Sequence, residues 1–135
     1  MRILGVDYGS KRIGLAISDE TATIAQSVGY VTGGVADVVR VATERGAGKI
    51  VVGVPVKLDN THSPQTERTL AFIKQLSEGT TLPVARWDER LTTAQAERVL
   101  IEGNVQRKDR REQIDKLAAQ LMLQSYLDAT GNAAL

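Results

Sequence analysis

The chain of 135 residues contains no cysteine, one histidine, and few aromatic residues: one Trp, three Tyr and one Phe. Without cysteine there is neither a disulfide framework nor a thiolate metal site. No apolar run approaches the roughly 20 residues that a helix needs to cross a bilayer, and the amino terminus lacks the apolar stretch of a signal peptide. We therefore expect a cytoplasmic protein without a membrane span, and with few rings on which bases could stack.

Neither sign of charge dominates the chain. Seventeen Lys and Arg residues stand against sixteen Asp and Glu residues, which gives a net charge of +1. The overall charge therefore does not demand a nucleic-acid partner, and any such partner would have to be held by local patches. A hydrophobic content of 42% suffices for one core at this length but not for two. We predict a single domain over residues 1–130, followed by a short tail at 131–135.

The apolar pattern alternates between strand and helix periodicity after a strand-rich opening. In chain order it predicts strands over residues 2–7, 12–18 and 24–31, a helix from 35 that stops at Gly46, a strand over 49–54, a helix over 64–78 capped by Ser63, a strand over 82–87, and helices over 92–102 and about 110–128. Hairpins followed by such alternation are typical of a mixed α/β sheet with helices on both faces.

Carboxylates occur at three places that this sheet could bring together. Asp7 closes the first strand, Asp88 and Glu89 close the fifth, and Asp115 lies in the last helix. Carboxylates at one edge of a sheet suit Mg²⁺ or Mn²⁺, and paired cations of this kind hydrolyse phosphodiesters. Spacing alone leaves another interpretation open, because acids after strands also cap helices and turns, and Asp115 could pair with Arg111 four residues earlier.

Strand alternation separates the two middle acids. If the strand continued, Asp88 and Glu89 would face opposite ways, so one of them is expected to bind the metal, and we favour Glu89 for its reach. Near Asp7, Gly9 removes a side chain that would block close approach of a phosphate or an ion.

Basic side chains near these acids could hold the phosphates of a nucleic acid without reading its bases. Tyr8, next to Asp7, is the best candidate for contact with a base or sugar. The later basic residues are interleaved with acids, so a plain solvated surface remains an alternative for them. The predicted phosphate contacts are Lys11, Arg12, Arg90 and Arg111.

Four motifs occur in order along the chain: GVDYGSKRIGLAISD at 5–19, IVVGVP at 50–55, DERLTTAQA at 88–96 and IDKLAAQLMLQSYLD at 114–128. Together they resemble the YqgF/RuvX family, whose members are named both as Holliday junction resolvases and as pre-16S ribosomal RNA nucleases. The resemblance implies a ribonuclease H-like fold with a five-stranded sheet whose first three strands are antiparallel. It also favours Asp115 as a metal ligand over the ordinary helix-edge acid.

The sequence departs from classical resolvases of this fold at the second carboxylate. That acid is expected on the fourth strand, which here ends Gly53-Val54-Pro55 without one. The fifth strand must then supply it. We therefore predict Asp7, Asp88, Glu89 and Asp115 as catalytic residues, with Asp7, Glu89 and Asp115 holding Mg²⁺ or Mn²⁺.

The resemblance implies a metal-dependent nuclease that processes the 5′ end of precursor 16S ribosomal RNA. A Holliday junction resolvase is the alternative, and a non-catalytic RNA-binding factor is a third possibility. A resolvase normally requires a two-fold dimer, whereas a monomer can trim one strand. We expect a nucleic-acid partner, with RNA favoured and DNA as the alternative, and a monomer or weak homodimer.

Overall fold

The computed structural model describes residues 1–56, 59, 61–89 and 107–131, with the side chains of 107–116 and of 131 outside that description. The helix predicted over 92–102 therefore lies outside the described residues, and so does Arg90.

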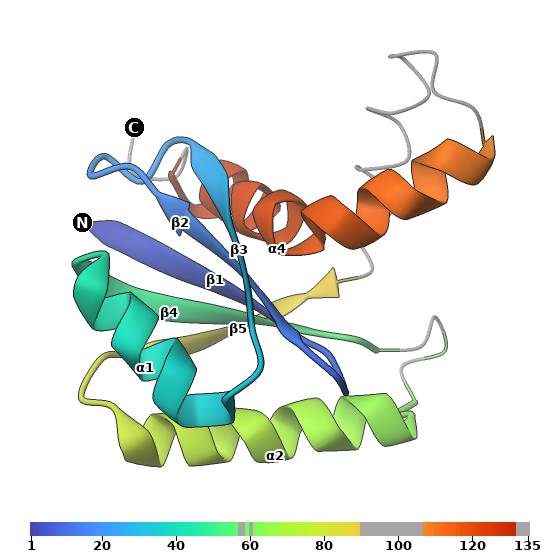
Figure 1. The fold of residues 1–135 in the computed structure, drawn as a ribbon, viewed down its shortest axis with the longest axis horizontal. Helices are drawn as coiled ribbons and strands as arrows, with labels where there is room; N and C mark the ends of the chain where they lie inside the picture. Colours follow the sequence, from blue (N-terminus) through green and yellow to red (C-terminus); the bar gives the residue numbers. More distant parts are fainter. Residues whose placement is uncertain (57–58, 60, 90–106, 132–135) are drawn as a thin grey trace.

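Five strands and three helices make up the described fold (Figure 1). The strand order is β3-β2-β1-β4-β5, with β2 antiparallel to both of its neighbours, β1 and β3, and with β4 and β5 parallel to β1. This confirms the predicted mixed sheet with three antiparallel strands at its start. The elements are β1 Arg2–Tyr8, β2 Ile13–Ser18, β3 Ala25–Val31, α1 Gly34–Glu44, β4 Ala47–Val54, α2 Pro64–Gly79, β5 Val84–Asp88 and α4 Arg107–Gly131.

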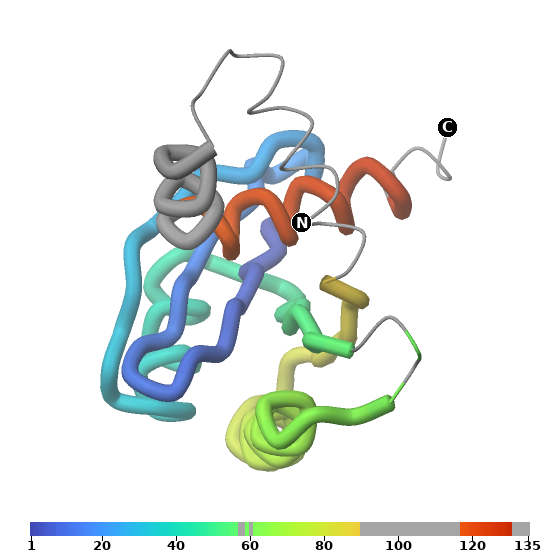
Figure 2. Tube along the Cα trace, turned by 90° about the vertical axis from the view of Figure 1, so that its right-hand side faces the viewer, coloured from blue at the N-terminus to red at the C-terminus, as the bar shows by residue number. Residues whose placement is uncertain are grey.

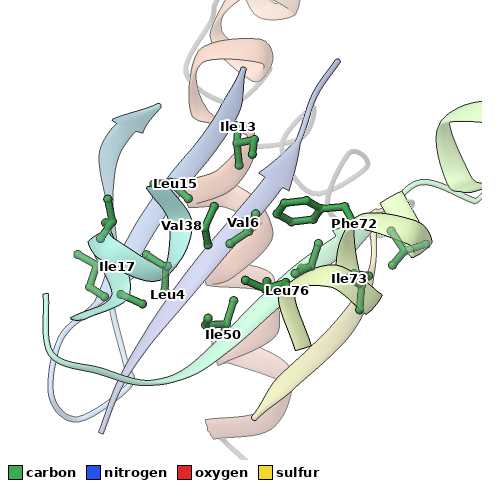
Figure 3. Close-up of a cluster of buried hydrophobic side chains, with 14 residues drawn as sticks. Leu4, Val6, Ile13, Leu15, Ile17, Val38, Ile50, Phe72, Ile73 and Leu76 are labelled. Carbon is green, nitrogen blue, oxygen red and sulfur yellow. The ribbon is translucent and has the colours of Figure 1, made fainter. Parts of the chain in front are cut away.

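Helices cover both faces of the sheet. Helices α1 and α2 lie on one face and α4 crosses the other (Figures 1 and 2). Side chains alternate along β1, so Leu4 and Val6 join the core under α1 and α2 (Figure 3), whereas Ile3 joins the core under α4. The central strands are therefore buried on both sides, which explains the continuous apolar run in β4.

Glycines let α4 approach the sheet closely. A Cβ atom built on Gly5 would lie 2.8 Å from the Cβ of Leu123, and one built on Gly14 would lie 3.6 Å from the Cβ of Ala119. Gly14 is the register partner of Asp7. Gly5 thus lies under Leu123, and Asp7, two residues further along β1, lies in the row that is under Ala119. The amino-terminal part of α4 therefore lies toward the carboxyl end of β1.

The ends of the elements agree with the predictions with small differences. Ser63 caps α2, as the sequence predicted, because its hydroxyl accepts a hydrogen bond from the backbone N–H of Thr66. The backbone N–H of Ser63 in turn donates to the Thr66 hydroxyl, which completes a capping box. Strand β4 begins at Ala47, earlier than predicted, because Ala47 pairs with Arg2 at a register shift. None of the helices in the described ranges is both long and apolar enough to span a membrane.

Candidate active site

Asp7 lies at the carboxyl end of β1, on the face of the sheet that α4 covers. It is flanked on both sides by glycine: Gly14 is its partner on β2, and the pairing of Val6 with Val52 sets Gly53 beside it on β4. A Cβ atom on Gly14 would lie 3.7 Å from the Cβ of Asp7, which is ordinary contact. No side chain of the neighbouring strands therefore competes with the carboxylate of Asp7 for the space above this row.

Glu89 fills the space above Gly53. A Cβ atom built on Gly53 would lie 2.5 Å from Oε1 of Glu89, 2.8 Å from its Cγ and 3.1 Å from its Cδ. The φ of Gly53 lies outside the left-handed region, so the backbone conformation does not require glycine at this position. Glycine is required because any Cβ atom there would overlap the carboxyl of Glu89. In this position the side chain of Glu89 hydrogen-bonds that of Asp7. The carboxyl of Glu89 thus reaches over β4 from the end of β5, as the prediction that the fifth strand supplies the second acid requires.

The surroundings of Glu89 favour its neutral form. Burial raises the pKa of Glu89 to about 9, and the hydrogen bond to Asp7 and the negative charges of Asp7 and Asp88 add to the effect. At neutral pH the Glu89 carboxyl therefore carries a proton and donates it in a hydrogen bond to the Asp7 carboxylate. Two carboxyl groups that meet in this way present oxygen atoms of the kind that hard divalent cations bind.

Asp88 belongs to the other face of the sheet. It is the register partner of Val54, which packs in the core under α1 and α2, whereas Trp87 pairs with Gly53 and packs under α4. Asp88 still acts on Glu89 through its charge. The alternation predicted for Asp88 and Glu89 thus places Glu89, rather than Asp88, on the face of Asp7.

Trp87 ties the end of β5 to α4. Its Nε1 donates a hydrogen bond of 3.2 Å to Oγ of Ser125, and its ring meets that of Tyr126 edge to face with 5.6 Å between centroids. These contacts fix the strand end from which Glu89 departs.

Asp115 lies on α4, and its side chain is outside the description. Its position is four residues before Ala119, on the helical stripe that continues through Ala119 and Leu123 over β1 and β2. The backbone thus carries position 115 one turn further toward the carboxyl end of β1. Among the side chains that are described, no three acids or histidines form a metal-binding group, so the predicted set of Asp7, Glu89 and Asp115 stays a prediction.

The geometry of the β1–β2 turn requires glycine at position 9. Its backbone N–H donates to the carbonyl of Arg12 at 3.1 Å, and a Cβ atom on Gly9 would lie 2.6 Å from that carbonyl oxygen. Lys11 and Arg12 are exposed at this turn, as phosphate contacts would have to be. Of the other predicted phosphate contacts, Arg90 and the side chain of Arg111 lie outside the described residues.

Tyr8 points away from Asp7. Its ring stacks on Phe72 of α2 with 4.5 Å between centroids, and its carbonyl accepts a hydrogen bond from Gln65. Neighbours along a strand face opposite sides of a sheet, so Tyr8 and Asp7 are separated by the sheet itself. The role predicted for Tyr8 as a base contact stays a prediction that this geometry does not support.

Sequence reasoning missed the part that Gly53 plays. The signal was present, because a glycine inside an otherwise continuous apolar strand often marks close approach of another group. What the sequence could not supply was the identity of that group, which comes from a different strand.

Comparisons with known proteins agree with this architecture. The sequence model described as "RuvX: Holliday junction resolvase" matches residues 1–129. A protein of Thermoanaerobacter pseudethanolicus is 44% identical over 98% of this chain and 99% of its own length, and one of Listeria monocytogenes is 46% identical over 96% and 99%. Both are named "Putative pre-16S rRNA nuclease".

Solved structures show the same fold at low sequence identity. The RuvC protein of Thermus thermophilus, in complex with a Holliday junction, superposes with a TM-score of 0.61 at 17% identity, covering 98% of this chain and 96% of that one. The fowlpox virus Holliday junction resolvase superposes with a TM-score of 0.54 at 19% identity, covering 96% and 99%. The predicted ribonuclease H-like fold is confirmed. With its family model matched over nearly the full length, the chain belongs to the RuvX family.

Proposed function

We propose that this protein is a divalent-metal-dependent nuclease that hydrolyses phosphodiester bonds in the 5′ region of precursor 16S ribosomal RNA during ribosome biogenesis in the cytoplasm. One observation carries the proposal: the carboxyl of Glu89 lies over Gly53 against Asp7, with its pKa raised to about 9. Two partly buried acids in direct contact, one with a strongly raised pKa, are a common arrangement at sites that do chemistry.

The residues present fit a hard divalent cation. Carboxylate oxygens are the ligands that Mg²⁺ and Mn²⁺ prefer, and the glycine at position 53 leaves the space in which Glu89 reaches Asp7. Asp7 and Glu89 would hold the cation, with Asp115 completing the set from α4. When bound, the cation supplies positive charge against the negative charge that develops on a phosphodiester during hydrolysis.

Other residues would orient the substrate. Lys11 and Arg12 project from the turn that follows Asp7, where they would contact phosphates on either side of the bond that is cut. Arg90 directly follows Glu89 in the chain, and Arg111 precedes Asp115 by one helical turn; we assign both to the same role. The net charge of +1 makes such local contacts the source of affinity.

Ribosomal RNA is the favoured substrate, because the curated relatives at 44% and 46% identity are named as pre-16S rRNA nucleases. A Holliday junction resolvase is the second candidate, because the family model carries that description and RuvC bound to a junction has the same fold. A resolvase cuts two strands symmetrically and so requires a two-fold dimer. Light scattering at assay concentration separates the two, and we expect a monomer or a weak homodimer.

The decisive experiment incubates the protein with Mn²⁺ or Mg²⁺ and matched substrates: a single-stranded RNA spanning the 5′ precursor region of 16S RNA, a single-stranded DNA of the same sequence, and a four-way junction. We expect cleavage of the RNA that is lost in Asp7→Asn and in Glu89→Gln. The control is Asp128→Asn, which removes an exposed carboxylate that accepts a hydrogen bond from Gln124 near the far end of α4.

Each result has a separate meaning. Cleavage of the junction alone, by a dimer, would replace the first proposal with the second. Binding of RNA without cleavage at any metal concentration would refute a nuclease and leave a non-catalytic RNA-binding factor. Equal loss of activity in Asp128→Asn and Asp7→Asn would show that the assay reports charge rather than the site.

A further inference from the structure

The aromatic residues of this chain divide into two packed pairs and one exposed ring. Tyr8 stacks on Phe72, and Trp87 meets Tyr126 edge to face. These four rings and Tyr30 are all the Phe, Trp and Tyr residues of the sequence. Tyr30 is 61% exposed, although it lies within a strand of the sheet. The packing of the core therefore accounts for the other four rings but not for Tyr30.

Tyr30 lies in the same row of the sheet as Asp7. The register pairs Asp7 with Gly14 and Gly14 with Tyr30. Directly paired residues of antiparallel strands point to the same face, and a Cβ atom built on Gly14 would lie 3.6 Å from the Cβ of Ala119 on α4. The ring of Tyr30 and the carboxylate of Asp7 thus project from one face. Only a glycine stands between them in the row, so no side chain at position 14 separates the two.

Among the described side chains of α4, those that hydrogen-bond the backbone of β3 do so at its beginning. The side chains of Gln120 and Gln124 hydrogen-bond both the carbonyl and the N–H of Ala25, at the start of β3. Tyr30 lies five residues further along the strand, which corresponds to about 17 Å. The helix is thus pinned over the beginning of β3, and Tyr30 is exposed near the other end of the strand.

Arg12 completes the surface. Its guanidinium carbon lies 5.1 Å from the centroid of the Tyr30 ring, within the range of a cation–π interaction. An aromatic ring beside a cation is the combination that single-stranded nucleic acids use: the base stacks on the ring, and the cation neutralises the adjoining phosphate.

The distance from Asp7 suits a strand bound across the site. Two strand spacings separate Asp7 from Tyr30, which is about 10 Å between Cα atoms. At the rise of about 3.4 Å per nucleotide in a stacked strand, this corresponds to roughly three nucleotides, and to fewer when the strand is extended.

We propose that Tyr30 and Arg12 form a stacking subsite for one base of a single-stranded RNA, within three nucleotides of the phosphate that lies at Asp7. The base stacks on the face of the Tyr30 ring that Arg12 leaves open, and the Arg12 guanidinium contacts the neighbouring phosphate. This subsite rests on the proposed nuclease function for its register, but the binding itself does not require catalysis.

The first test measures binding of a fluorescent single-stranded RNA by anisotropy in EDTA, where no divalent cation supports cleavage. We expect Tyr30→Ala to weaken binding on the order of 10-fold, because a base stacked on an aromatic ring contributes about this much. Tyr30→Phe keeps the ring and should bind as the wild type does. The matched control is Ile24→Ala, which removes an apolar side chain that is 59% exposed just before β3 and should leave affinity unchanged.

A second measurement locates the base. Abasic nucleotides are placed one at a time along the RNA, and we expect one position to cost the wild type about 10-fold while costing Tyr30→Ala nothing. The salt dependence separates the two residues: Arg12→Gln should reduce the slope of log K against log salt by about one, whereas Tyr30→Ala should leave it unchanged.

The outcomes distinguish the subsite from the proposed function. Wild-type affinity in Tyr30→Ala, or an abasic penalty that persists in that variant, would overturn the subsite even if Mn²⁺-dependent cleavage is observed. Ring-dependent binding by a protein that never cleaves would support the subsite and refute the nuclease. Failure of the wild type to bind any single strand would overturn the subsite, and equal ring-dependent binding of DNA would extend it to both nucleic acids.

Discussion

The raised pKa of Glu89 makes the stability of the metal-free protein depend on pH in a specific direction. The carboxyl of Glu89 has an ordinary pKa of 4.5 and a pKa of about 9 in the folded protein. Between these values the folded state holds the proton and the unfolded state has lost it. Folding therefore takes up a proton, and the free energy of unfolding falls as pH rises.

The size of the effect follows from the same two values. Each pH unit inside this window changes the free energy of unfolding by about 1.4 kcal/mol, so the step from pH 6 to pH 8 lowers it by about 3 kcal/mol. The other large shift in the described residues is that of Asp19, whose pKa is lowered chiefly by the hydroxyl of Thr21 and by backbone N–H groups. It titrates below pH 4, outside this range.

Glu89→Gln isolates the cause. A neutral amide keeps a donor toward Asp7 but cannot ionise, so the variant should lose the decline of stability between pH 6 and pH 8. Urea unfolding in EDTA at three pH values supplies the measurement, and Trp87, the single tryptophan, reports it because its ring packs on α4. Asp128→Asn should keep the slope of the wild type.

Addition of Mn²⁺ should act in the opposite sense. Asp7 and Glu89 would hold the cation only after the proton is lost, so Mn²⁺ should raise the stability of the wild type most at pH 8 and leave Glu89→Gln nearly unchanged. A slope in Glu89→Gln equal to that of the wild type would show that Glu89 is not the titrating group, and the reasoning would fail at its first step.

Three further predictions concern packing around the site. Gly53→Ala should displace the Glu89 carboxylate and weaken Mn²⁺ binding, measured by calorimetry, by about 10-fold or more. The control Gly14→Ala adds a methyl group that makes only ordinary contacts, and it should change the Mn²⁺ affinity by less than about twofold. Gly5→Ala should lower the free energy of unfolding by about 1–3 kcal/mol, since the added Cβ overlaps α4; an unchanged urea midpoint would contradict this. Ser63→Ala should cost about 1 kcal/mol by removing the cap of α2, again read from urea unfolding, with no effect on Mn²⁺ affinity.

Local chemistry was enough to predict most of the fold. Apolar runs bounded by turn residues placed the strands, and Ser63 followed by Pro64 placed the start of α2 correctly. The differences arise where pairing with a distant segment decides the boundary. Ala47 is drawn into β4 by Arg2, whereas β5 begins only at Val84, since the preceding Pro83 contributes a carbonyl to Ile50 but has no N–H to give.

The site was predictable in part for the same reason. The position of Asp7 at a strand end and the opposite directions of Asp88 and Glu89 follow from strand geometry alone. The same alternation places Tyr8 on the other face from Asp7, a consequence that the prediction of a base contact did not use. The role of Gly53 and the exposure of Tyr30 depend on which strands become neighbours and on where α4 contacts the sheet. Local sequence does not determine either the strand order or the position of the helix.

The origin of the second acid has a consequence for how the site is held together. A carboxylate rooted within β4 would be fixed by the hydrogen bonds of two neighbouring strands. Glu89 instead follows the last paired residue of β5, and its side chain crosses to β4. Its position therefore depends on the absence of a side chain at Gly53 and on the hydrogen bond that holds Trp87 to Ser125. Burial beside Asp7 penalises its charged form. The free protein therefore keeps the two acids together through a proton, and on the proposed function Asp7 and Glu89 would hold a divalent cation only once that proton is released.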